Sequence, residues 1–205
     1  MRKKTEEKRQ SIIDAALDVF REVGFEQASM TQIATRSGAS KATLYSYFES
    51  KEALFAETMT SRAGSEIRQA FDRLTLDVPL RESLTAFGLH YLNAVLQPSF
   101  LSTRRLCVQE VDRSNVGRVL YETGPQQGLM HVRDFLASAI EARTMRPCEP
   151  EVAARHLLAL IEAELVELAL LGYEVKTSRA KLTPVVNRAV DVFMAAYAAG
   201  ASSAN

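Results

Sequence analysis

Tryptophan is absent from the 205-residue sequence, and aromatic residues make up only 7% of it. Strands favour aromatic and β-branched residues that alternate with polar ones, and no stretch bounded by turn residues shows that alternation. Alanine and leucine recur instead at the three- and four-residue spacing of amphipathic helices. The sequence therefore predicts an all-α protein.

Cysteine is also scarce, since Cys107 and Cys148 are the only two. They are too far apart in the sequence to have the spacing of metal ligands. The first ten residues, MRKKTEEKRQ, lead into an amphipathic pattern and not into an apolar segment, so no signal peptide is expected. The most apolar run, LLALIEAELVELALLG, contains Glu162, Glu164 and Glu167, which argues against a membrane span. We therefore expect a cytoplasmic protein.

The formal net charge is zero, because 25 basic side chains balance 25 acidic ones. Residues 1–51 nevertheless carry a small excess of Lys and Arg, and the rest of the chain carries a small excess of Asp and Glu. This asymmetry has the sign expected if the N-terminal part meets an anion.

Three helical segments are predicted before residue 51. The first runs from about residue 5 to residue 23 and ends at Gly24, where a left-handed conformation suits glycine. Ser29 and Gln32 have the spacing of a capping box and open the second segment, which Gly38 ends. Ser40 caps the third. Two short helices joined by a few residues that include glycine are typical of a helix-turn-helix unit.

Longer amphipathic segments follow. A helix is predicted over 51–74, and Pro98 is expected to end another over 80–97. The next helix, over 101–123, has an irregularity near Ser114 and Asn115. Gly124 and Pro125 then mark a turn before a helix over 126–145. The last two helices are predicted over 151–172 and 184–198, the second with Thr183 as N-cap and Pro184 at its first position.

Two stretches carry a family resemblance. The segments IIDAALDVFREVGFEQASM and TQIATRSGASKATLYSYFESKEALF resemble the DNA-binding domain of the TetR family of bacterial transcriptional repressors, without gaps. Residues 118–125, RVLYETGP, are similar to the RxFYExGP segment of an AcrR-like C-terminal subgroup, although Arg113 and Ser114 replace its upstream Phe-Pro pair. We therefore expect a DNA-binding domain over residues 1–51, a helical effector-binding and dimerisation domain over 52–198, and a disordered tail over 199–205.

Residues 40–48, SKATLYSYF, would form the recognition helix. Leu44 and Phe48 lie four apart on one face and are expected in the core. Small side chains at the helix start allow a close approach to base edges, and tyrosine hydroxyls donate to phosphates. The resemblance implies DNA contacts for Thr31, Lys41, Ala42, Thr43, Tyr45, Tyr47 and Lys51. Two alternatives stay open: Tyr45 covers a core edge, or Thr31 only caps its helix.

No catalytic motif accompanies this unit. The sequence lacks a glycine-rich phosphate loop, GxSxG and HExxH, and His90, His131 and His156 are dispersed. Cys107 follows two arginines, but a small buried hydrophobe is the simpler interpretation, and a redox role stays open for Cys107 and Cys148. We expect no enzyme activity, cofactor or metal site. The alternative, an enzyme or scaffold with an incidental helix-turn-helix, needs a catalytic cluster that we do not find.

The last two predicted helices are expected to join two copies of the chain into a homodimer. The segment 152–171 is apolar around most of its circumference, which is more than one packed face requires. The alternative is that both helices form the core of a monomer. The residues predicted at the interface are Leu157, Ile161, Leu165, Leu168, Val186, Val190, Phe193 and Tyr197.

Aromatic side chains on the preceding helices favour an apolar pocket for a small organic effector. The residues predicted to line it are Phe71, Phe87, Tyr91, Tyr121, Met130, Phe135 and Glu164. A ligand there is expected to lower DNA affinity through the helix over 51–74. Together with the resemblance, this predicts a transcriptional repressor that binds a palindromic operator as a dimer and is released by an effector.

Overall fold

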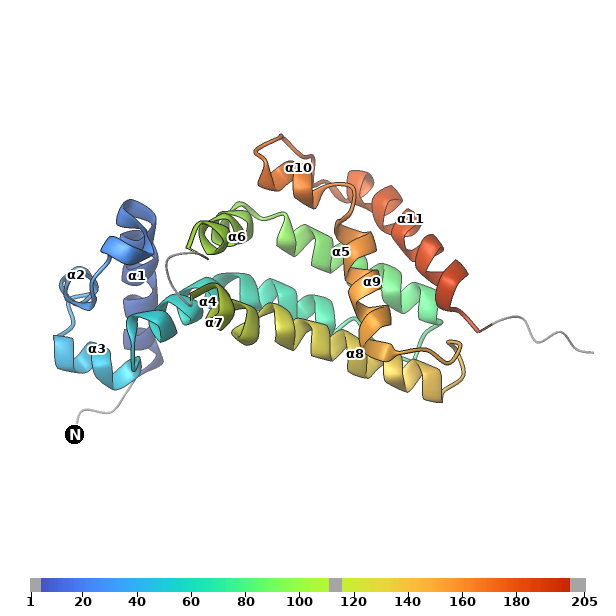
Figure 1. Cartoon of the computed structure of the whole chain (residues 1–205), viewed down its shortest axis with the longest axis horizontal. Coiled ribbons are helices and arrows are strands. Elements are labelled where there is room, and N and C mark those ends of the chain that lie inside the picture. Colours follow the sequence, from blue (N-terminus) through green and yellow to red (C-terminus); the bar gives the residue numbers. More distant parts are fainter. Residues whose placement is uncertain (1–4, 111–115, 200–205) are drawn as a thin grey trace, which may run out of the picture. The chain divides into compact units, whose positions relative to one another are not determined.

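The computed structural model describes residues 5–110 and 116–199. In that part of the chain the regular elements are helices, apart from one isolated bridge between Met145 and Ala198 (Figure 1). The all-α prediction is confirmed. The helices are α1 (Glu6–Gln27), α2 (Met30–Arg36), α3 (Lys41–Tyr47), α4 (Lys51–Phe71), α5 (Leu80–Val95), α6 (Pro98–Glu110), α7 (Val116–Thr123), α8 (Pro125–Glu141), α9 (Pro150–Glu162), α10 (Val166–Leu170) and α11 (Arg179–Tyr197).

The chain divides into two compact units. One comprises Met1–Arg62 and Ser102–Gly124, and the other comprises Ala63–Leu101 and Pro125–Asn205. This division differs from the expected boundary at residue 51, because α7 groups with the N-terminal helices. Helices α4 and α6 each contribute residues to both units.

Capping side chains set the helix starts in the first unit. Ser29 and Gln32 form the predicted capping box, in which each side chain bonds to the other residue's backbone N–H. The hydroxyl of Ser40 accepts the N–H of Thr43 at 3.0 Å. Each bond satisfies a donor that the first turn of a helix leaves unpaired. Both predicted helix starts are therefore confirmed.

The first helix does not end at Gly24. It bends there, because Gly24 has φ 78° and ψ 168°, and then continues to Gln27. Glycine adopts a positive φ without the steric cost that a Cβ atom brings. The N–H of Ala28 donates to the carbonyl of Gly24 at 3.3 Å, which closes this final turn.

Three phenylalanines form the centre of the first unit's core. Phe20 and Phe25 come from α1 and Phe55 from α4, and each is at most 1% exposed. The ring centroid of Phe55 lies 4.8 Å from that of Phe20 and 5.0 Å from that of Phe25, in edge-to-face geometry. These contacts hold the first turns of α4 against α1.

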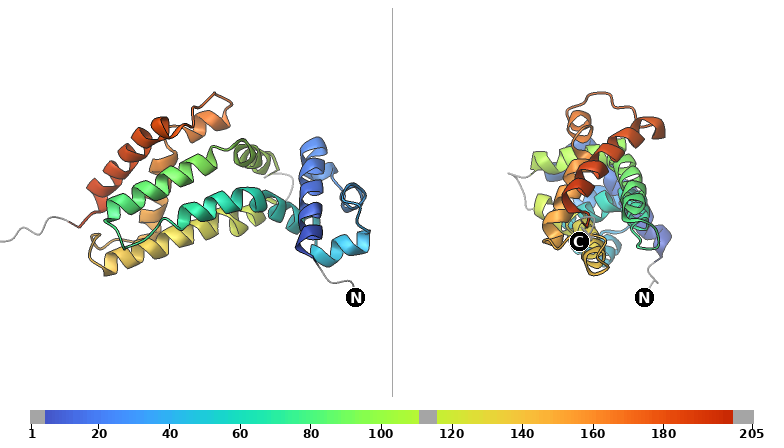
Figure 2. Two further views of the ribbon diagram at one scale, coloured as in Figure 1. Left: turned by 180° about the vertical axis from the view of Figure 1, so that it is seen from behind. Right: turned by 90° about the vertical axis from the view of Figure 1, so that its right-hand side faces the viewer.

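The second unit is built from packed helices: α9 lies against both α8 and α11, and α11 lies against α5 (Figure 2). Gly88 allows α5 and α11 to approach closely, because a Cβ atom there would lie only 2.7 Å from Cγ1 of Val186. Apolar side chains from all four helices fill the core between them. None of the described helices is long and apolar enough to cross a membrane.

Helix boundaries in the second unit differ from the predicted ones. The segment over 151–172 is two helices, because the backbone of Leu165 leaves helical geometry at φ −124° and ψ −33°. The last helix begins at Arg179, so Pro184 lies inside it and Thr183 is not its N-cap. Burial explains this earlier start, since Leu182 is only 2% exposed and holds the first turn in the core.

Pro98 also has a different role from the predicted one. Pro98 was expected only to end a helix, but it is the first residue of α6, where its missing N–H costs no helical hydrogen bond. The irregularity predicted near Ser114 and Asn115 lies outside the described residues.

Candidate nucleic-acid interface

One face of α3 is exposed to solvent. Lys41, Ala42, Tyr45 and Ser46 are exposed on it, whereas Leu44 is fully buried in the core. Residues that are four apart lie above one another on a helix, so 41, 42, 45 and 46 form one surface. The sequence prediction left out Ser46, which the spacing from Ala42 could have indicated.

The two remaining α3 residues of the prediction are half-buried, and their hydroxyls bond within the chain. Oγ1 of Thr43 lies 2.7 Å from Oγ of Ser40. The Tyr47 hydroxyl accepts the backbone N–H of Thr5 at 2.8 Å, and its ring packs against the core. Tyr45 is 46% exposed and is therefore the tyrosine on the open face.

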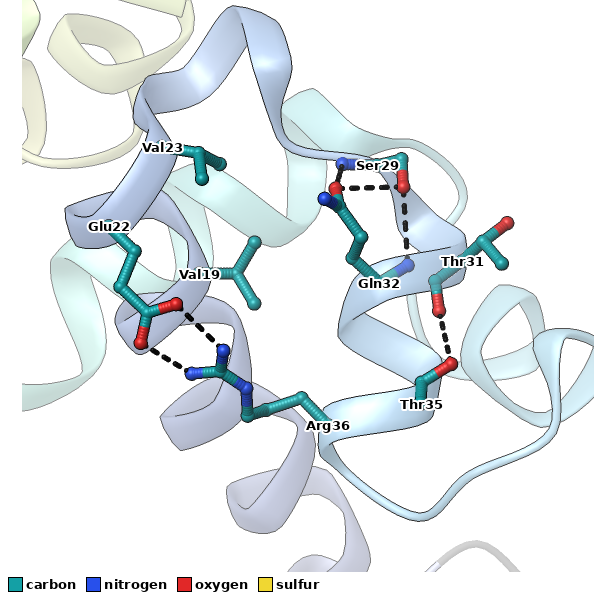
Figure 3. A pocket seen from close by; sticks show the side chains of 8 residues that line it. All are labelled: Val19, Glu22, Val23, Ser29, Thr31, Gln32, Thr35 and Arg36. Atoms are coloured by element: carbon teal, nitrogen blue, oxygen red, sulfur yellow. Dashed lines mark hydrogen bonds and ion pairs between the residues drawn. The ribbon is translucent and has the colours of Figure 1, made fainter.

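Thr31 lies at the edge of an open hollow between α1 and α2 (Figure 3). Its side chain is exposed, and the capping of α2 is carried out by Ser29 and Gln32. Thr31 is therefore not needed as a cap. The hollow is lined by Val19, Glu22, Val23, Ser29, Thr31, Gln32, Thr35 and Arg36.

Polar contacts fix α2 and the following turn against α1. Both terminal nitrogens of Arg36 donate to the carboxylate of Glu22, at 2.7 Å each (Figure 3). Hydrogen bonding from Arg36 lowers the pKa of Glu22, and the same bonds raise the pKa of Arg36. Nζ of Lys8 donates to the carbonyls of Ser37 and Gly38 at 2.9 and 3.3 Å. The turn between α2 and α3 is thereby held in place.

Lys51 was also predicted to contact DNA. In this structure its ammonium group donates to three backbone carbonyls at the junction of α1 and α2. The side chain is half-buried.

Three of the residues predicted to line an effector pocket form an aromatic stack in the second unit. The ring centroid of Phe87 lies 5.7 Å from that of Phe71 and 5.4 Å from that of Tyr91. The Tyr91 hydroxyl donates to Oε1 of Glu162 at 2.7 Å. Glu162, which the pocket prediction did not name, is therefore the acidic partner of Tyr91.

The other four predicted pocket residues differ in exposure and in the unit to which they belong. The Glu164 carboxylate is exposed and bonds to Arg188, which lowers the pKa of Glu164. Tyr121 is 43% exposed on α7 and belongs to the first unit. Met130 and Phe135 are half-buried on α8. The pocket as a whole stays a prediction.

Most residues predicted at a dimer interface fill the core of the second unit. Leu157, Ile161, Val186, Val190 and Phe193 are fully buried within a single chain. Tyr197 is 9% exposed, Leu165 is half-buried and Leu168 is 44% exposed. A contact between two copies on α9 and α11 would therefore use the exposed neighbours of the buried residues.

The cysteines and histidines form no recognisable site in the described part of the chain. Burial raises the pKa of the half-buried Cys148 thiol, which keeps it protonated. The side chain of Cys107 lies outside the described residues. Nδ1 of His156 lies 2.6 Å from the Tyr197 hydroxyl. Among the side chains that the structure describes, no group of three His, Cys, Asp or Glu residues could hold a metal ion.

Family models match both parts of the chain. The model of the C-terminal domain of AefR-like transcriptional repressors matches residues 82–199, and that of bacterial regulatory proteins of the tetR family matches residues 12–58. The chain belongs to the TetR family. The TetR-family helix-turn-helix unit is DNA-binding, and the protein is a transcriptional regulator.

Solved structures agree with the TetR assignment. The flavonoid-responsive regulator FrrA superposes with a TM-score of 0.83 and 31% identity, covering 96% of this chain and 100% of that chain. A TetR-family regulator from Mesorhizobium loti MAFF303099 superposes with a TM-score of 0.79 and 27% identity, covering 95% of this chain and 100% of that chain. The HTH-type transcriptional regulator YhgD from Bacillus subtilis (strain 168) is 23% identical over 159 residues, which are 75% of this chain and 80% of YhgD. All three of these relatives are regulators.

Proposed function

We propose that this regulator is a repressor that binds a palindromic operator as a homodimer and is released by a small organic effector. The exposed face of α3 is the observation that carries the proposal. Lys41 can reach a phosphate or a guanine, the methyl group of Ala42 can contact a thymine methyl, and the Tyr45 hydroxyl can donate to a phosphate. Two such helices related by a two-fold axis match the two halves of a palindrome.

Selection from a random pool of DNA duplexes by the purified protein tests this function. We expect enrichment of one inverted repeat, with half-site centres about one helical turn apart or slightly more. A pool that stays random after repeated selection would contradict sequence-specific binding, and enrichment of a single unrepeated half-site would contradict the palindrome.

Lys41→Met should weaken binding to the selected operator and to a random duplex alike. The substitution removes one phosphate partner from the exposed face, and phosphates are the same in every sequence. The slope of log affinity against log salt should therefore fall by roughly one unit. Fluorescence anisotropy across a salt series measures this. An unchanged slope together with unchanged affinity would show that Lys41 does not touch the DNA backbone.

The effector is proposed to be a planar, largely apolar compound. The stacked rings of Phe71, Phe87 and Tyr91 favour an aromatic ligand, and the Tyr91–Glu162 pair adds a polar group at one end. FrrA, which is 31% identical over nearly the whole chain, is flavonoid-responsive. Phe71 of this stack is the last residue of α4, and α4 contributes residues to both units, so we propose that the ligand lowers DNA affinity through this helix.

Titration of the regulator with a panel of flavonoids, with and without saturating operator, tests the effector proposal. For any compound that releases DNA, operator must weaken ligand binding by the same factor, about 5- to 150-fold. Isothermal calorimetry gives both affinities. A compound that binds equally well in both titrations is not the effector, and a panel in which no member alters operator affinity would contradict the proposed ligand class.

A further inference from the structure

Lys51 is the first residue of α4, and it reaches back to the junction of α1 and α2. We infer that Lys51 is a positioning residue that fastens α4 to this junction and that it does not bind a phosphate. The inference rests on the proposed function, because its effect is measured on operator recognition.

The ammonium group of Lys51 has no donor left for DNA. A lysine ammonium carries three N–H donors. Nζ of Lys51 lies 2.8 Å from the carbonyl oxygen of Phe25, 3.2 Å from that of Glu26 and 3.2 Å from that of Ala28. A bond to phosphate would therefore leave one of these carbonyls without its lysine donor.

The end of α1 suits a cation at this position. The final carbonyls of a helix lack partners within it, and they carry the negative end of the helix dipole. The bend at Gly24 ends regular helix geometry just before the carbonyls of Phe25 and Glu26. Nζ of Lys51 also lies 4.3 Å from the ring centroid of Phe25, which is a cation–π distance.

The hydrogen bonds from Lys51 to these three carbonyls form a clamp that lies directly before α2 and α3, the helices of the helix-turn-helix unit. Ala28, one of its three partners, is two residues before the start of α2 at Met30. The aromatic contact of Phe55 with Phe25 lies one turn further along α4, so Lys51 and Phe55 hold the same junction from two successive turns. Loss of the clamp should therefore change the placement of α2 and α3 while the hydrophobic core stays intact.

A matched pair of substitutions, Lys51→Met and Lys41→Met, separates positioning from phosphate binding. The probes are the duplex selected by the parent protein and a random duplex of equal length, each across a salt series. For Lys51→Met we expect an operator affinity about tenfold lower, the equivalent of one charge-assisted hydrogen bond. Its affinity for the random duplex and its salt slope should stay near the parent values, unlike those of Lys41→Met.

Lys51→Arg is the conservative control. Its guanidinium keeps several donors for the same carbonyls and should restore most of the preference for operator over random duplex. Circular dichroism confirms that each variant is folded, and Lys51→Gln replaces Lys51→Met if the latter is not. A salt slope reduced by about one unit for Lys51→Met would overturn the inference, because it is the signature of a lost phosphate contact.

Two further outcomes separate a failure of the inference from a failure of the proposed function. A lower melting temperature with an unchanged ratio of operator to random affinity would mean that Lys51 only stabilises the fold, and this too would overturn the inference. If the parent protein prefers no sequence over random duplex, the proposed function itself fails.

Discussion

Phe55→Ala should lower the free energy of unfolding of the DNA-binding unit by about 3–5 kcal/mol. The Phe55 ring is fully buried and makes edge-to-face contacts with both Phe20 and Phe25, so alanine leaves a cavity between α1 and α4. Domains of ordinary size have only about 5–15 kcal/mol to lose. Urea unfolding followed by circular dichroism measures the change, and operator binding should be lost in parallel.

Phe55→Leu is the matched control, because it keeps most of the buried volume. It should cost less than about 1.5 kcal/mol and leave DNA binding nearly intact. Tyr45→Ala, on the exposed face of α3, should leave stability almost unchanged while weakening DNA binding. A cost of less than about 1 kcal/mol for Phe55→Ala would contradict the central role given to the three phenylalanines.

The sequence predicted the first unit well because local chemistry determines most of it. Ser29 and Ser40 cap the helices that follow them, and the partners of their hydroxyls are only three residues away. Gly24 and Gly38 adopt the positive φ values that end or bend regular helices. Signals of this kind are readable because cause and effect lie within one turn of the chain.

The second unit was harder to predict, because its helix boundaries depend on tertiary packing. Neither glycine nor proline occurs between α9 and α10, so nothing in the sequence marks the break before Val166. Pro184 suggested a helix start, but burial of Leu182 extends α11 past it. Packing overrode the local preference in both cases.

The prediction of DNA-contacting residues was also limited by contacts between distant parts of the chain. Lys41, Ala42 and Tyr45 lie on the exposed face of α3, as the helical spacing indicates. The sequence could not show that Tyr47 bonds to Thr5 or that Lys51 bonds to Phe25, because these partners are 42 and 26 residues away in the chain. Long polar side chains find backbone partners that only the folded structure brings near.

The buried residues of α9 and α11 also change how a dimer would form. Outside the core, α9 exposes Val152 and Ala159, and α11 exposes Val192, Ala195 and Ala196. Val152 is 45% exposed and Val192 is 54% exposed, so both present apolar surface that a second copy could cover. Small and apolar side chains at these exposed positions would let α9 and α11 of two copies approach each other across a two-fold axis.

Val192→Glu should therefore halve the mass of the protein in solution, because it places a charge where two identical surfaces would meet. The same substitution should lower operator affinity by a factor on the order of 10², since each half-site then binds its chain independently. Light scattering at micromolar concentration gives the mass, and anisotropy gives the affinity. Leu76→Glu is the matched control, because Leu76 is 42% exposed before α5 and its replacement should change neither value. A Val192→Glu protein that keeps a dimeric mass would place the interface elsewhere, and a monomeric parent would contradict the dimer itself.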